Sequence, residues 1–548
     1  MTLPYLRSLA APAALLFATA CSKDPEPEPL PEQPTLAPGD ACDPDVIAAA
    51  QTEDPEDDMD PQPICAPGLA CEPLAEGEDF VCGAALRLRG KVRDSATGLG
   101  IAGALVAALN ENGEPVTDVV ASDSCGGYDL PIRVRRKPDG SFAEQLRWTL
   151  TVSARDYQPF PTGLRPALPI DLSDAQPNPD GVEPPLASTD PAAEPRPTYA
   201  YEVVDNAATS VALISLGSAA KGVSISGTLG VDAAGTLVVA EGPAAPAPYA
   251  IADASGDYVL FNVQPGSVTV RGYRQGVESQ PATVDVAAAD LTNVDLAVVS
   301  SDPAALATVT GSLSIVDASG GSVTSVVLVP ASVYNAPLER GPVPLGLRDP
   351  PPPAAPDVSG SFTLTGVPAG TYKVLVAFEN DLLVRDPDPG ISGTQIQEIT
   401  VERGQTTPVD AAFKVTGALA IVAPGKDDPE EVEASPTFVW ADDSGEDGYT
   451  IVVFDALGAQ VWTTELPGST GSDTVELTYG GPALVAGMYY QFRVTSWREV
   501  KGERLDISRS EDLRGVFFHG QAPAETECVA EADGSSSDTG GGESSAGS

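Results

Sequence analysis

The sequence predicts an all-β protein built from tandem β-sandwiches. Three observations support this prediction: a repeated strand pattern, apolar residues confined to short β-rich runs, and a high content of turn residues. Gly and Pro number 53 each among 548 residues, about 19% of the chain, a share between those of ordinary globular and low-complexity chains. The length corresponds to roughly four or five domains of about 100–150 residues.

The first 20 residues have the features of an export signal. Arg7 supplies a positive charge, residues 9–17 form an apolar stretch, and small residues precede Cys21. The apolar stretch is shorter than the ~20 residues that span a bilayer. Residues 17–21 (FATAC) resemble a bacterial lipobox, which implies cleavage before Cys21 and acylation of that cysteine. The alternative is an ordinary cleavage site beside a chance cysteine.

Residues 21–40 are rich in Pro and Glu, and we expect them to form an extended, hydrated tether. Two or more acyl chains on Cys21 would anchor the chain stably in a membrane. By the same resemblance, Ser22 implies sorting to the bacterial outer membrane, on its surface or its periplasmic face. No other apolar run is long enough to span a bilayer.

Residues 41–83 form an acidic, cysteine-rich segment with too few apolar residues for a core. An exported chain meets an oxidising compartment, which predicts two disulfides among four cysteines: Cys42, Cys65, Cys71 and Cys82. Zinc is the less favoured alternative, because no His lies nearby. Calcium binding by the acidic run at residues 53–60 is also open. Cys125 and Cys528 either pair with each other or remain free.

The middle of the chain contains a repeated β-pattern. Residues 255–264 (SGDYVLFNVQ) align without gaps on residues 359–368 (SGSFTLTGVP), and a third copy begins at residues 126–130 (GGYDL). Each copy reads as a turn glycine, an aromatic residue and an alternating strand. Similar segments open the copies at residues 88, 223 and 309 and close them near residues 216, 298 and 413.

These segments resemble carboxypeptidase regulatory-like domains, most clearly in residues 88–98 (LRGKVRDSATG). The resemblance implies transthyretin-like sandwiches, a fold grouped with carbohydrate-binding-like and Cna-B-type domains. We assign them to residues 84–217, with a Pro-rich insertion near residues 159–197, and to residues 222–298 and 306–414. No peptidase activity is implied, because the zinc-binding His/Glu set is absent from the sequence.

Residues 416–520 form a different β-unit that resembles a fibronectin type III-like, Ig-like sandwich. We expect Trp440 in its core and Tyr490, Phe492 and Val494 on the inward face of a late strand. Residues 521–548 become acidic and then rich in Ser and Gly, a composition that predicts a disordered tail.

The composition excludes several classes of function. A net charge of −48 argues against nucleic-acid partners. The chain has one histidine, His519, so we expect no catalytic residues of the Ser-His, Cys-His or His-metal type, no metal site and no cofactor. The GxGxxG match at residues 98–103 lacks the helix that a dinucleotide site requires. An enzyme using paired carboxylates stays open, although no motif selects a pair.

The leading hypothesis is a non-enzymatic surface lipoprotein whose sandwiches act as spacers and protein-interaction modules. Its partners would be the membrane, through the lipid anchor, and other envelope proteins. The alternative is a polysaccharide-binding lipoprotein. Trp497 and Tyr157 are its candidate glycan contacts, as the aromatic residues that we expect to be most exposed.

Overall fold

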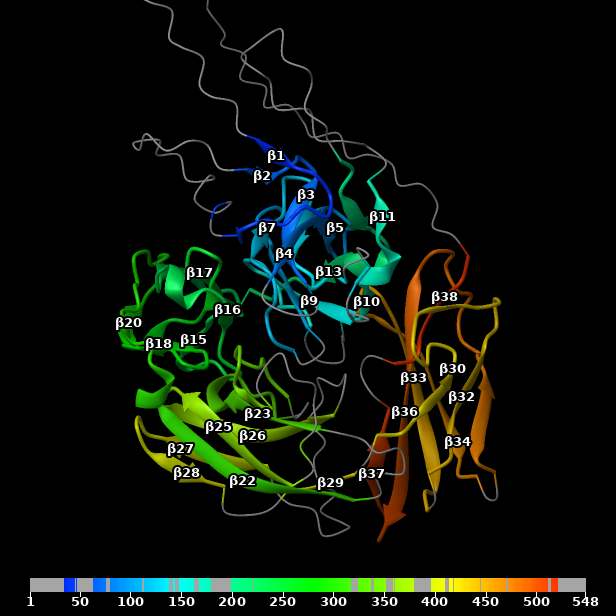
Figure 1. The fold of residues 1–548 in the computed structure, drawn as a ribbon. Helices are drawn as coiled ribbons and strands as arrows, with labels where there is room; N and C mark the ends of the chain where they lie inside the picture. The colour runs from blue at the N-terminus through cyan, green and yellow to red at the C-terminus, as the bar shows by residue number, and fades with distance from the viewer. Residues whose placement is uncertain are drawn as a thin grey trace, which may run out of the picture.

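The computed structural model is all-β, with four β-sandwiches and a small N-terminal module (Figure 1). It describes residues 34–520 except 45, 47–62, 75–78, 111–112, 138–140, 143–146, 162–166, 179–198, 219, 317–323, 337–339, 351–357, 359, 379–395, 410–412, 417, 444, 470–471 and 511–513. The predicted signal, Cys21, most of the tether, the acidic run at 53–60 and the tail lie outside the described residues. Within the described part of the chain, no helix has the length and apolarity to cross a membrane.

The N-terminal module consists of two short strand pairs. Strand β1 (Thr35–Leu36) pairs in parallel with β2 (Ile64–Cys65), and β3 (Leu69–Pro73) pairs antiparallel with β4 (Phe80–Ala84). The β3–β4 register sets Cys71 directly opposite Cys82.

The first sandwich encloses a core between two sheets. One contains β5 (Leu86–Asp94), β8 (Gly127–Ile132), β11 (Gln176–Pro177), β12 (Glu202–Val204) and β13 (Val211–Leu213). The other contains β6 (Leu105–Leu109), β7 (Val120–Ala121), β9 (Arg147–Ser153) and β10 (Ile170–Asp171). Leu86, Leu88 and Val92 of β5 are buried at every second position, as the two-residue period of a strand requires.

The second sandwich pairs β14 (Val223–Thr228) with β17 (Asp257–Val263). Its other sheet contains β15 (Leu237–Glu241), β16 (Tyr249–Ile251), β18 (Gly266–Tyr273) and β20 (Ala282–Val286), while β19 (Glu278–Ser279) pairs with β21 (Val298–Ser300).

The third sandwich packs a sheet of β22 (Ala307–Val316), β25 (Ser361–Val367), β28 (Thr406–Pro408) and β29 (Phe413–Thr416) against a second sheet. That second sheet contains β23 (Thr324–Pro330), β24 (Arg348–Asp349), β26 (Gly370–Phe378) and β27 (Gln397–Val401). Tyr372, Val374 and Val376 of β26 are buried on one face, as their alternation predicts.

The repeated aromatic residue occupies the same place in all three copies. It lies opposite a glycine of the opening strand: Tyr128 opposite Gly90, Tyr258 opposite Gly227, and Phe362 opposite Gly311. A Cβ atom on Gly90 would lie 2.1 Å from the carbonyl oxygen of Thr209, so a side chain there would collide with the backbone. The hydroxyl of Tyr128 donates to that same carbonyl at 2.5 Å, and Tyr258 donates equivalently to Val294.

The fourth sandwich has a three-stranded sheet of β30 (Ile421–Ala423), β32 (Thr437–Ala441) and β35 (Thr474–Thr478). Its larger sheet contains β31 (Glu430–Glu431), β33 (Gly448–Asp455), β34 (Gln460–Pro467), β36 (Tyr489–Val500), β37 (Glu503–Arg509) and β38 (Val516–Phe518). Trp440, Tyr490, Phe492 and Val494 are buried in the core, as predicted. Phe438 and Phe492 stack between the two sheets, with ring centroids 4.3 Å apart.

The first sandwich lies in the upper middle of Figure 1, coloured from blue through cyan to green-cyan. The second and third, green to yellow-green, lie on one side of it and below it, and the fourth, orange, lies on the other side. The second and third share one core cluster, to which Leu237 and Tyr273 of the second contribute. The four sandwiches therefore do not form a single extended row.

Candidate functional site

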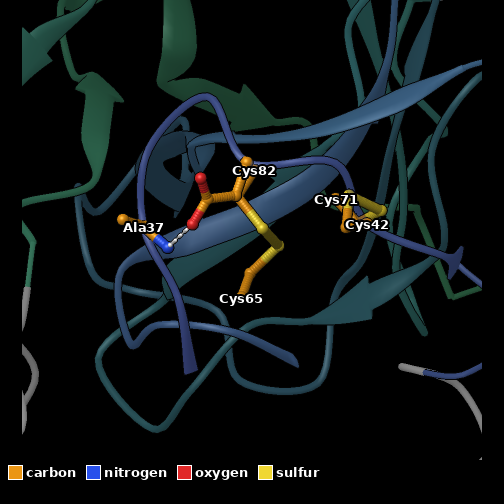
Figure 2. The surroundings of a disulfide bond; sticks show 6 residues. Ala37, Cys42, Cys65, Cys71 and Cys82 are labelled. Carbon is orange, nitrogen blue, oxygen red and sulfur yellow. Dashed lines mark hydrogen bonds between the residues drawn. A yellow bond between two sulfur atoms is a disulfide. The ribbon is translucent and has the colours of Figure 1, made fainter. Parts of the chain in front are cut away.

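The cysteine-rich module contains both predicted disulfides, and the structure supplies their pairing. Cys42 is bonded to Cys71 and Cys65 to Cys82, with Cα atoms 5.9 and 5.6 Å apart. Figure 2 shows the two bonds on neighbouring segments of the module. The module therefore has the covalent cross-links that a segment with so few core residues needs.

Three sulfur atoms of this module, from Cys42, Cys65 and Cys82, lie within 4.8 Å of one another. Each belongs to a disulfide, so none is a thiolate able to bind a metal ion. Cys125 is also disulfide-bonded. Cys21 and Cys528 lie outside the described residues.

A buried ion pair joins the module to the first sandwich. Glu72 of β3 is fully buried and accepts from the Nε–H of Arg136. The same guanidinium donates to the carbonyl of Ala84 at 2.6 Å and to Glu202 at 3.4 Å. Burial raises the pKa of Glu72, and the charge of Arg136 opposes that rise. The module is thus packed onto the sandwich rather than only tethered to it.

The first and third sandwiches meet through a second buried pair. Glu114, between β6 and β7, lies 3.1 Å from Nε of Arg348 on β24, and both side chains are buried. The backbone N–H of Gly346 donates to the other carboxylate oxygen of Glu114 at 3.0 Å. Charges withdrawn from water require such hydrogen-bonded partners, so this contact specifies how the two sandwiches dock.

The second sandwich is joined to the first by the side chain of Asn262. Its Oδ1 accepts from the N–H of Asp156 at 2.8 Å, and its Nδ2 donates to the carbonyls of Ala154 at 3.2 Å and Tyr157 at 3.0 Å. Asn262 has φ +61°, in the left-handed region that asparagine tolerates better than most residues. Arg155 adds an exposed bidentate pair with Asp290, both contacts at 2.8 Å.

The fourth sandwich contacts the first beside a group of carboxylates. Arg147 of β9 pairs with Asp428 at 3.1 Å, and the hydroxyl of Tyr489 donates to Asp174 at 3.4 Å. Burial, and secondly the nearby Asp171, raises the pKa of Asp174. The raised pKa of Asp174 makes this contact sensitive to pH.

A cavity of about 280 Å³ lies where the first three sandwiches meet, and it is partly open to solvent. The first sandwich lines it with Tyr157 and Leu216, the second with Tyr249 and Phe261, and the third with residues that include Arg340. Its walls are mainly apolar, the usual composition of a site for small molecules. No sequence motif marks this cavity, because its walls come from three separate sandwiches.

The two candidate glycan contacts lie in different places. Tyr157 is half-buried, lines this cavity and donates its hydroxyl to Asp94 at 3.1 Å. Trp497 on β36 is also half-buried, and the guanidinium of Arg504 covers its ring, 4.7 Å from the centroid. Neither side chain is an exposed platform: Tyr157 packs against the core of its own sandwich, and strand β37 supplies the cation over Trp497.

His519 follows β38, and its Nδ1 lies 2.8 Å from the carbonyl oxygen of Val432. It is half-buried and binds the backbone of its own sandwich, which is a structural role.

Comparison with protein-family models and with curated proteins finds no match for this chain. Solved structures with some similarity include the Bacillus anthracis TIE protein, at 11% identity over 79% of this chain and 72% of that chain, with a TM-score of 0.13. Two B repeat units of the collagen binding protein of Staphylococcus aureus cover 80% of this chain and 99% of that chain, at 13% identity and a TM-score of 0.16. The major pilin subunit BcpA of Bacillus cereus gives 11% identity, 61% and 100% coverage, and a TM-score of 0.16. TM-scores this low support no functional argument, so function must be argued from the chain itself.

Proposed function

We propose that this chain is a non-enzymatic, lipid-anchored protein of the bacterial cell envelope whose sandwiches form one rigid scaffold for binding. The observation that carries the proposal is the docking of three sandwiches onto the first through specific polar contacts. The buried Glu114–Arg348 pair and the three hydrogen bonds of Asn262 are the strongest of them.

A rigid scaffold fits this arrangement better than a spacer does. Sandwiches that act as a spacer gain reach by joining end to end, whereas these pack around a common centre (Figure 1). Reach would come from the part of the tether before the N-terminal module, because β1 already includes Thr35 and Leu36. The remaining residues 21–33 would span roughly 40 Å at about 3.1 Å per residue. The sandwiches would then present surfaces to protein partners at that distance from the membrane.

Location in the envelope is supported by the export signal, the lipobox-like segment before Cys21, and the disulfides. The repeats' resemblance to carboxypeptidase regulatory-like domains, and that of the fourth sandwich to fibronectin type III-like domains, supports a binding role. The single histidine, engaged with backbone, supports a protein without enzymatic activity. The polysaccharide alternative has less support, because Trp497 is covered by Arg504.

The anchor is tested with Cys21→Ser, compared with the matched variant Ser22→Ala. We expect palmitate labelling and membrane fractionation to be lost in the first and retained in the second. Labelled, membrane-bound Cys21→Ser protein would refute the anchor. The scaffold is tested separately by small-angle X-ray scattering of the unanchored chain. A scattering curve of an extended, flexible string of domains would refute it.

A further inference from the structure

The bonding state of Cys125 identifies a third disulfide. The chain has seven cysteines, and four of them form the two bonds of the N-terminal module. Cys125 is itself disulfide-bonded, so its partner is one of the two cysteines that remain, Cys21 or Cys528. We propose that the partner is Cys528, and that this bond joins the chain beyond the fourth sandwich covalently to the first sandwich.

The choice between the two cysteines rests on the proposed function. In a lipid-anchored protein the sulfur of Cys21 is already bonded to the acylated glycerol of the anchor. A disulfide requires a thiol on each partner, and Cys21 then has none to offer. Cys528 is the cysteine that is left to pair with Cys125.

The turn that contains Cys125 does not need a cysteine in order to fold. Its backbone is held by Asp123, whose Oδ1 accepts from the N–H of Cys125 at 2.8 Å. The second repeat has the same turn, in which Oδ1 of Asp253 accepts from the N–H of Ser255 at 2.9 Å. The third repeat also has serine at this position, residue 359. The cysteine of the first repeat therefore replaces a serine that suffices for the turn, as expected if its sulfur serves a cross-link.

The position of the turn makes this sulfur accessible to another part of the chain. The turn joins β7 to β8 at the surface of the first sandwich, where Asp123 and Ser124 are exposed. Cys125 itself is half-buried. A segment that approaches from the solvent can therefore form a bond here without disturbing the core of the sandwich.

The fourth sandwich ends close to its contact with the first. Its last strand, β38, ends at Phe518, whose ring stacks on that of Tyr489, and Tyr489 donates to Asp174 of the first sandwich. The described chain ends at Gly520, eight residues before Cys528. Eight extended residues reach at most about 26–29 Å, close to the diameter of a small domain. The tail can therefore extend from this contact across a neighbouring sandwich.

A covalent link strengthens the docking of the fourth sandwich where its polar contacts are weak. Arg147 pairs with Asp428, but the side chain of Asp428 is 55% exposed, and ion pairs that water reaches contribute little. A cross-link keeps the two sandwiches at a high effective concentration, so that their contact reforms after each opening. We expect the bond to hold the fourth sandwich on the first in an oxidising compartment.

Formation of this bond is a two-electron oxidation. The thiols of Cys125 and Cys528 lose two protons and two electrons as the S–S bond forms. The disulfide of a thiol–disulfide oxidoreductase takes up both protons and both electrons and becomes two thiols. The same class of oxidant would form the two bonds of the N-terminal module.

Peptide mapping of the full chain, extracted from membranes and kept unreduced, tests the assignment. Free thiols are blocked with N-ethylmaleimide, and the denatured chain is then cut with trypsin. Cys125 is released in residues 94–133, Cys528 in residues 515–548, and Cys21 in a separate peptide that ends at Lys23. We expect residues 94–133 and 515–548 to form one disulfide-linked species, which dithiothreitol separates into its two peptides.

Cys125→Ser and Cys528→Ser are the matched variants, and the first restores the serine of the other repeats. On non-reducing gels the parent chain should migrate faster than either variant, because the bond closes a loop of about 400 residues in the denatured chain. The control that replaces Cys65 and Cys82 by Ser opens a link of only 17 residues and should keep most of this difference. In both matched variants we expect several-fold faster amide exchange at Tyr489, with unchanged exchange in β22 of the third sandwich.

Each contrary result overturns the proposal and shows which part of it failed. Residues 94–133 linked to the Cys21 peptide would overturn both this bond and the lipid anchor. Cys125 labelled by N-ethylmaleimide, or linked to a second copy of the chain, would overturn the bond alone, because palmitate labelling reports on the anchor separately. A mapped bond with unchanged amide exchange in both variants would overturn its role in holding the fourth sandwich.

Discussion

Glu114 of the first sandwich and Arg348 of the third form an ion pair across their interface, with 3.1 Å between Oε2 and Nε and both side chains buried. The two residues are 234 positions apart in the chain. Hydrophobic packing alone accepts many relative orientations of two sandwiches, whereas a buried charge pair accepts very few. The pair therefore serves orientation at least as much as stability.

Removing one member of this pair should be costly. Glu114→Ala leaves Arg348 buried without its carboxylate, and we expect the free energy of unfolding to fall by about 3–5 kcal/mol. Replacing both residues by Met should lower the free energy of unfolding far less, because no charge is then left buried. Denaturant titration of the two variants checks this. A single variant as stable as the parent chain would show that the pair is not needed for docking.

The hydroxyl of Tyr258 should contribute about 1–2 kcal/mol to the free energy of unfolding, because its loss leaves the buried carbonyl of Val294 without this donor. Tyr258→Phe removes only the hydroxyl, and the equivalent Tyr128→Phe should cost a similar amount. Tyr258→Leu serves as the matched variant that also removes ring packing. Thermal unfolding measures all three variants. If Tyr258→Phe and the parent chain have the same Tm, the repeated hydrogen bond does not stabilise the fold.

The contact between the first and fourth sandwiches should strengthen as pH falls. Burial and Asp171 raise the pKa of Asp174, so the folded chain holds its proton more readily than the unfolded chain does. This contribution is complete below the unfolded pKa of about 3.9 and is lost as pH rises through the higher folded value. Asp174→Asn should therefore raise stability at pH 7 by roughly 0.5 kcal/mol, with no gain near pH 3.

The Tm of the parent and of Asp174→Asn, measured between pH 3 and pH 8, checks this prediction. Asn keeps an acceptor for Tyr489, whereas the control Asp174→Ala removes that acceptor. A constant difference in Tm across the pH range would contradict the assigned shift.

The disulfides should hold the strands of the N-terminal module together. Replacing Cys65 and Cys82 by Ser opens a link across 17 residues, and a loop of that size implies a loss of about 3 kcal/mol. We expect faster amide exchange in β3 and β4, with unchanged exchange in β33 of the fourth sandwich as the internal control. Unchanged exchange in β3 would mean that the Cys42–Cys71 disulfide and the Glu72–Arg136 pair hold this strand without Cys65–Cys82.

Much of the local architecture was predictable because it follows from short-range patterns. Alternation in residues 86–94 gives an inward face of Leu86, Leu88 and Val92, and the repeated glycine–aromatic pattern marks equivalent strands. Two disulfides followed from four cysteines in a segment that lacks a core and that the sequence predicts to be exported. Their pairing did not, because four cysteines allow three pairings. The observed pairs are not even those that face each other across β3 and β4, since Cys71 lies opposite Cys82 but is bonded to Cys42.

The docking contacts and the cavity could not be predicted in the same way. Glu114 lies in a turn rich in polar residues, and Asn262 lies near the end of strand β17, so neither carries a sequence signal. The exposure of Trp497 could not be predicted from the sequence either, because the cation over its ring comes from β37, the strand paired with its own. Exposure of a single aromatic depends on the strand or sandwich that happens to lie against it.

The sequence by itself determined the all-β class, the repeats, the residues of each core face and the cysteines that cross-link the N-terminal module. These follow from strand periodicity and turn chemistry, which act over a few residues. Only the tertiary structure decided that the other three sandwiches each contact the first, and that the first three enclose a cavity. That outcome depends on contacts between residues more than a hundred positions apart, such as Glu114 and Arg348, whose partners are set by packing rather than by any local pattern.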